Sequence, residues 1–246
     1  MMMQALKAAA QQQGGAAIDF DIENDITWHS LFWAEGTAMT ALAYGDTDAV
    51  TTWPNETSET DLTTSSLPYK ASNPDLNGKP SVEMVSGNGV RLVGTWGTAP
   101  SNSAPVSMVI VVSNNNTDQN SRSLAHIGDA KFEARGDSGG SICVNAGGVR
   151  MLKINSVNND TDGHLMVGVI FDDPTSALYV DGGTATNKDL GYTAFTGSTM
   201  GLGSANGGYR MQSDVALFGV YEGDITADGS WSDMQSWVST HYGVTI

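Results

Sequence analysis

The sequence predicts an all-β fold, a sandwich of two antiparallel sheets, and three observations support it. Short apolar runs alternate with clusters of Gly, Asn, Asp, Ser and Thr along most of the chain, a texture typical of strands separated by turns. At 246 residues and 40% hydrophobic side chains, the chain has an ordinary size for one sandwich with a sizeable core. The single cysteine, Cys143, allows no internal disulfide, so we expect packing alone to hold the fold.

The expected strands are short runs rich in Val, Ile and Leu, bounded by turn residues. The run 165–171 is almost wholly apolar, which suits a central strand covered on both faces. Asn88-Gly89 and Asp162-Gly163 are dipeptides favoured in tight hairpins, and Asp181-Gly182-Gly183 is a further turn signal. In chain order the expected strands are 31–34, 50–53, 81–85, 90–95, 106–112, 124–128, 131–134, 141–145, 149–155, 164–172, 177–181, 199–203 and 215–222.

Two helices are expected, one near each end of the chain. At the start, Met, Ala, Leu and Gln favour a helix that Gly14-Gly15 ends, so residues 1–17 form a short arm. Near the end, Asp228 or Ser230 caps a helix that Gly243 closes, with apolar residues at helical spacing between them. Residues 18–246 are expected to form one domain, with a loop-rich part from Ile18 to Gly87.

The charge excludes some classes of partner. The net charge is −16, from 27 acidic and 11 basic residues. Such a chain lacks the clustered Lys and Arg that bind phosphates, so nucleic acid is not an expected partner. Anionic membrane surfaces would repel it. No apolar run is long enough to span a bilayer, and the first residues make a poor signal peptide.

The segment Gly136-Asp137-Ser138-Gly139-Gly140 resembles the surround of a nucleophilic serine. A serine nucleophile needs a base within hydrogen-bond reach and an acid behind that base. The chain has four histidines, and neither His29 nor His126 lies in the setting that a trypsin-like protease requires. We therefore interpret the segment as a turn between two apolar strands, and no catalytic residue is assigned.

The sequence also contains part of a calcium-loop pattern and lacks the carboxylate spacing of a glycosidase. Asn158, Asp160 and Asp162, followed by Gly163, resemble the first half of a calcium loop, but Val169 stands where that loop needs a Glu. A hairpin loop is the favoured interpretation, with calcium as the alternative cofactor. The spacing Glu-x-Asp-x-x-Glu of a sandwich glycosidase does not occur.

Three stretches together carry a resemblance to a known family. In this order they resemble the concanavalin A-like, laminin-G-type jelly-roll domains found in virion proteins of tailed bacteriophages. The resemblance covers about residues 18–246. The stretches are 50–58 with 67–69 and 76–84, then 164–169 with 177–182, and finally 215–221 with the closing helix to Val244.

The resemblance implies a function and a location. It implies a jelly-roll sandwich that acts as a non-enzymatic structural protein of a phage virion, as a capsid decoration or a minor tail protein assembled in the host cytoplasm. Its partners would be other virion proteins, with a homo-oligomer as a further expectation. The arm would anchor the module, through Met1, Met2, Met3, Leu6, Ala9 and Ala10.

Two alternatives stay open. The first is a carbohydrate-binding module that recognises host-surface glycans through aromatic rings beside Asp and Asn. The second, less favoured, is a hydrolase of glycans or one that uses Ser138. The aromatic residues expected to contact sugar are Trp53, Tyr69, Trp96, Tyr192 and Tyr209.

Overall fold

The computed structural model describes most of the chain in segments. These are residues 20–84, 92–95, 97–98, 100, 105–113, 122–128, 130–135, 141–146, 149–155, 163–170, 176–188, 199–203 and 213–246. Every described strand pairing is antiparallel. The all-β prediction is therefore confirmed, while jelly-roll connectivity stays a prediction.

Most strands match the predicted runs, because each apolar run is bounded by turn residues, whereas β3 and β13 were not predicted. Two short helices, α2 (Thr37–Thr40) and η1 (Pro74–Leu76), lie early in the chain, and η2 (Ile225–Ala227) and α3 (Trp231–Tyr242) lie near its end. The strands are β1 (Ser30–Trp33), β2 (Ala49–Trp53), β3 (Leu62–Asn73), β4 (Lys79–Met84), β5 (Leu92–Thr95), β6 (Val106–Ser113), β7 (Arg122–Ile127), β8 (Ala130–Arg135), β9 (Ser141–Ala146), β10 (Val149–Asn155), β11 (His164–Ile170), β12 (Ser176–Val180), β13 (Gly183–Lys188), β14 (Thr199–Leu202) and β15 (Ser213–Glu222).

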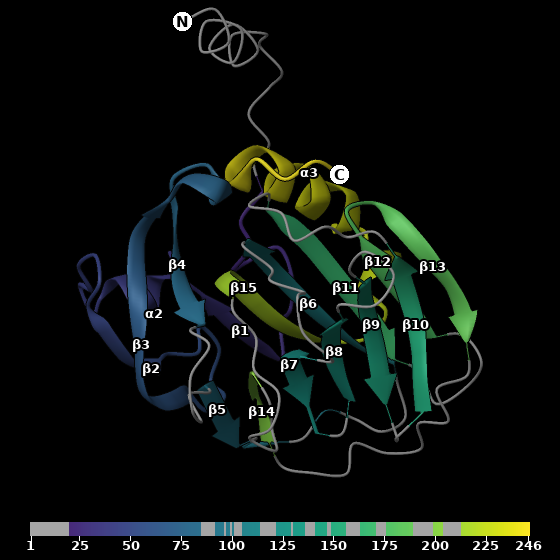
Figure 1. Cartoon of the computed structure of the whole chain (residues 1–246), viewed down its shortest axis with the longest axis horizontal. Coiled ribbons are helices and arrows are strands. Elements are labelled where there is room, and N and C mark those ends of the chain that lie inside the picture. The colour runs from purple at the N-terminus through teal and green to yellow at the C-terminus, as the bar shows by residue number, and fades with distance from the viewer. Residues whose placement is uncertain are drawn as a thin grey trace, which may run out of the picture.

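The strands form two layers that share β3. One layer runs in the order β4-β15-β6-β11-β12-β13, and the other in the order β10-β9-β8-β7-β14-β5. The first part of β3 pairs with β2 and β5, whereas its last part, from Tyr69 to Asn73, pairs with β4. At the far edge, β10 lies against β12 and β13. The sheet thus curls onto itself as a sandwich (Figure 1).

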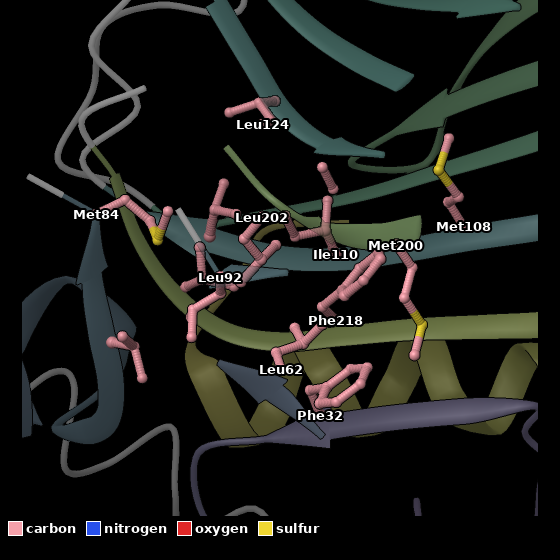
Figure 2. Packing of buried hydrophobic residues seen from close by; sticks show 14 of the residues in the cluster. Phe32, Leu62, Met84, Leu92, Met108, Ile110, Leu124, Met200, Leu202 and Phe218 are labelled. Carbon is pink, nitrogen blue, oxygen red and sulfur yellow. The ribbon is translucent and has the colours of Figure 1, made fainter. Parts of the chain in front are cut away.

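The main core lies between the two layers. Phe32 and Phe218 stack at its centre with ring centroids 5.9 Å apart. Figure 2 shows the side chains that surround them, contributed by strands of both layers. Alternation along β6 decides which side chains enter this core: Met108 and Ile110 face it, whereas Val109 faces the opposite side of the sheet.

A second core lies on the outer face of the layer that contains β15, β6 and β11. The chain from Phe20 to Trp28, the helix α3 and Val244 cover this face. In β11, Leu165 and Val167 join the second core and Met166 joins the first. The prediction that this strand is covered on both faces is therefore confirmed.

The closing helix was also predicted correctly. α3 begins at Trp231 and ends at Tyr242, and Gly243 follows with φ 72°, a left-handed conformation that favours glycine. Ser230 makes no side-chain capping bond. Instead Asp228 accepts a hydrogen bond from the Ser230 amide at 2.8 Å. No helix in the described segments is long and apolar enough to cross a membrane.

Candidate functional site

Two of the predicted sugar-contacting aromatics belong to the core. Trp53 is 0% exposed and Tyr69 is 7% exposed. Trp53 lies edge-on to Phe32 at 6.5 Å, and the Tyr69 hydroxyl donates to the Ala34 carbonyl at 3.1 Å. A buried ring offers no face to a sugar, so these two residues are structural and do not belong to a binding site.

The other predicted site residues lie outside the described segments and stay predictions. They fall into four groups. The groups are the sugar candidates Trp96, Tyr192 and Tyr209, the calcium candidates Asn158, Asp160 and Asp162, the arm residues Met1, Met2, Met3, Leu6, Ala9 and Ala10, and Ser138.

The structure places a polar cleft of about 560 Å³ at one end of the β15–β6–β11 layer. Four segments meet there: η1, the start of β11, the turn after β12, and the chain that leaves α3. Figure 1 shows α3 and the C-terminus beside this turn. The described residues that line the cleft are Pro74, Asp75, Asn77, Gly163, His164, Asp181, Tyr242, Gly243 and Thr245.

A histidine–aspartate pair forms one wall of the cleft. His164 Nδ1 lies 2.6 Å from Asp181 Oδ2, and Asp181 Oδ1 accepts from the Leu165 amide at 2.9 Å. Because a carboxylate only accepts, Nδ1 carries the proton. His164 is 8% exposed, and its Nε2 atom is buried without a hydrogen-bond partner among the residues that the structure describes. Such an atom is uncommon in folded proteins and often marks a site for water or ligand.

A second part of the cleft lining comes from the loop around η1. Asn73 accepts a hydrogen bond from the Asp75 amide at 3.0 Å, which turns the chain. Asn77 then adopts φ 56°, and its side-chain amide donates to the His241 carbonyl at 3.2 Å. This bond ties the loop to the end of α3. Asp75 is half-buried and forms no salt bridge with a basic side chain that the structure describes.

Tyr242 connects the cleft to a group of aromatic side chains. It lines the cleft, and its hydroxyl accepts a hydrogen bond from Trp33 Nε1 at 2.8 Å. Burial raises the pKa of the Tyr242 hydroxyl well above its ordinary value, and the charge of Glu35 raises it further. The hydroxyl is therefore a neutral hydrogen-bonding group at physiological pH.

We call Trp33, Trp237, His241, Glu35 and Lys79 the aromatic shelf. The five side chains are partly exposed. The His241 ring stacks on Trp237 with centroids 4.5 Å apart and planes 16° apart, and Trp33 meets Trp237 edge-on at 5.8 Å. The shelf lies beside the cleft because both are built on the last turns of α3.

Contacts between charged groups hold the side chains of the aromatic shelf in place. Glu35 accepts from His241 Nε2, and Lys79 Nζ lies 3.5 Å from its other oxygen. Burial raises the pKa of Glu35, but the hydrogen bonds and charges of His241 and Lys79 outweigh it, so the pKa lies below its ordinary value. Glu35 is therefore an anion that holds the imidazole against Trp237.

The arrangement suits a polar, uncharged ligand. Residues with carboxylate, amide and hydroxyl side chains line the cleft, and Tyr242 joins it to the partly exposed rings of Trp33 and Trp237. No group of three or more metal-binding side chains occurs among the described residues. Sequence reasoning missed this site. The signals available were His164 at the start of an apolar run and Asp181 in a turn.

Comparison with known proteins gives the fold only. No protein-family model and no curated protein matches the chain. A complex of Trypanosoma rangeli sialidase with 2,3-difluorosialic acid is similar with TM-score 0.56 and 13% identity, over 89% of this chain and 34% of that chain. The same sialidase in complex with sialic acid gives 0.55 and 13%, over 86% and 32%.

A more distant likeness carries no argument. The receptor-binding domain of botulinum neurotoxin mosaic serotype C/D matches with TM-score 0.47 and 8% identity, over 67% of this chain and 45% of that chain.

The chain spans about a third of the length of the sialidases that it matches, 32% in one case.

One prediction needs correction. The sequence was interpreted as that of a protein without enzymatic activity, on the grounds that it lacks a catalytic motif. The solved structures that share its fold at TM-scores of 0.55 and 0.56 are sialidases, which are enzymes. This finding overturns the non-enzymatic prediction. At 13% identity the likeness transfers the fold to this chain and nothing of the sialidases' activity.

Proposed function

We propose that the protein binds glycans in the polar cleft, with the aromatic shelf beside it as a second contact surface. The observation that carries the proposal is the cleft itself. It has a volume of about 560 Å³, and the residues that line it include Asp75, Asp181, Asn77 and Thr245, whose side chains carry two carboxylates, an amide and a hydroxyl.

Sugars suit this chemistry. Each sugar hydroxyl both donates and accepts, so it can donate to a carboxylate and accept from an amide. The C–H face of a sugar ring is apolar and suits contact with an aromatic ring that is partly buried and partly exposed to solvent. Trp33 and Trp237 are partly exposed and are held by their neighbours, so they are the aromatic rings proposed for this contact.

The fold comparison adds support of a limited kind. A solved structure with the same fold is a sialidase in complex with sialic acid. Sandwich folds also serve as lectins, but fold alone does not give function. The proposal therefore depends on the cleft and not on the likeness.

A glycan array followed by calorimetric titration tests the proposal. The parent chain should bind at least one glycan on the array. Asp75→Ala should then weaken binding about 10- to 100-fold, since a hydrogen bond to a charged group contributes roughly 1.5–3 kcal/mol. Asp233→Ala is the matched control, because Asp233 is an exposed acid on α3 and does not line the cleft.

Two results would contradict the proposal. One is an array on which no glycan binds the parent chain. The other is an Asp75→Ala variant that binds the selected glycan as tightly as the parent and the control do.

The virion role stays a separate prediction. In it the sandwich is displayed on a phage particle and held by residues 1–17, as a capsid decoration or a minor tail protein. The anchoring residues lie outside the described segments, and the comparisons give this role no support. Removal of residues 1–17 tests it, because the remaining sandwich should then fail to join the particle.

A further inference from the structure

We infer that the cleft selects uncharged glycans and disfavours anionic ones, including those that end in sialic acid. The inference rests on the proposed function and names the class of ligand for the same site. It comes from the charges in and around the cleft.

Two acidic residues line the cleft. Asp75 comes from the η1 loop and Asp181 from the turn after β12. The protein as a whole has a net charge of −16, so its long-range field also opposes the approach of an anion. The carboxylate of a sialic acid would meet both effects.

No free cation among the described side chains offsets this charge. Lys70 and Lys79 are the lysines and arginines whose side chains the structure describes. Lys70 lies 2.9 Å from Asp214 and 3.8 Å from Glu83. Lys79 lies 3.5 Å from Glu35. Each is held by an acid of its own, so neither is free to pair with a ligand carboxylate.

The histidine of the cleft does not supply a free cation either. His164 is hydrogen bonded to Asp181, so any positive charge on its ring is balanced by that carboxylate. Its second nitrogen, Nε2, is buried and has no hydrogen-bond partner in the described part of the chain. The ring therefore offers an anion little attraction, whereas a neutral hydroxyl faces no charge penalty at the cleft.

The test compares two oligosaccharides that differ only by a terminal sialic acid. Both are titrated into the full-length chain by calorimetry at low and at high salt. The neutral sugar should bind, and its sialylated form should bind at least about fivefold more weakly at low salt, since like charges a few ångströms apart repel even in water. High salt should reduce the difference in affinity between the neutral and the sialylated sugar, because it screens the repulsion.

Two variants locate the effect. Asp75→Asn should reduce the preference for the neutral sugar, because it removes a charge from the cleft wall and keeps the size of the side chain. Asp233→Asn removes the same charge from an exposed position on α3 and should leave the preference unchanged.

The outcomes separate the two proposals. Equal or tighter binding of the sialylated sugar would overturn the inference and leave glycan binding intact. A preference that both variants change equally would place its origin outside the cleft and would also overturn the inference. Failure of both sugars, and of every glycan on the array, would overturn glycan binding and this inference together.

Discussion

The imidazole of His164 lies 2.6 Å from the carboxylate of Asp181 and joins the first residue of β11 to the turn after β12. The turn itself needs positive φ, 49° at Asp181 and 75° at Gly182, as tight hairpins do. The same aspartate also accepts from the Leu165 amide. One side chain thus closes the β11–β12 pair and shapes a wall of the cleft.

Replacing Asp181 with Asn should weaken the hydrogen bonds that Asp181 accepts in this wall of the cleft. Asn fits the left-handed backbone, but it exchanges a charged acceptor for a neutral one, so we expect a loss of about 1 kcal/mol in the free energy of unfolding. Glycan affinity should fall as well. Urea denaturation and titration measure the two effects. An Asp181→Asn variant as stable and as active in binding as Asp233→Asn would show that the pair is dispensable.

Trp53 should matter for stability and not for binding. Its side chain is fully buried, so Trp53→Ala should cost about 3–5 kcal/mol through lost burial and a cavity. Trp53→Phe should cost less. Thermal denaturation measures the loss, and titration of the Phe variant measures affinity. A folded Trp53→Phe variant that has lost glycan binding would show that Trp53 contributes to the binding site.

Gly201 should tolerate no side chain. In β14 a Cβ at this position would lie 2.0 Å from the Leu92 carbonyl oxygen, whereas a Cβ on Gly229 would meet nothing within 4 Å. Gly201→Ala should therefore lower the free energy of unfolding by about 3 kcal/mol or prevent folding, and Gly229→Ala should change little. Equal denaturation midpoints for the two variants would mean that β5 and β14 do not approach as described.

The shelf should make stability depend on pH. The folded pKa of Glu35 lies below its ordinary value of 4.5. A carboxyl with a lowered folded pKa contributes stability above its unfolded pKa and loses it as the pH falls through the folded pKa. Glu35→Gln should therefore cost about 1 kcal/mol at pH 7 and progressively less below pH 4.5. A cost that does not vary with pH would show that the charge of Glu35 is unimportant.

Local pattern predicted most strands and the closing helix, because both depend on short-range periodicity. It missed β3 and β13. The segment Leu62–Asn73 is rich in Thr and Ser and contains Pro68, and it is a strand because β2, β4 and β5 pair with it. The segment Gly183–Lys188 is polar and becomes a strand by pairing with β12.

The site was harder to predict than the fold. The register of β11 and β12 pairs Met166 with Val180, so a hairpin model could have placed His164 near Asp181. Glu35 and His241 are 206 residues apart, and nothing local indicates that they meet. Two of the five predicted aromatic residues, Trp53 and Tyr69, failed for another reason. Exposure is a tertiary property, and Trp53 and Tyr69 are buried by strands far away in the chain.

The most direct test of glycan binding in the cleft is an NMR titration of the ¹⁵N-labelled chain with a glycan selected on the array. The account predicts that the amide signals of Asn77, Gly163, Leu165 and Gly243 shift with one common dissociation constant, while that of Gly201 in the core stays in place. Shifts confined to residues away from the cleft, or none at a saturating glycan concentration, would contradict it.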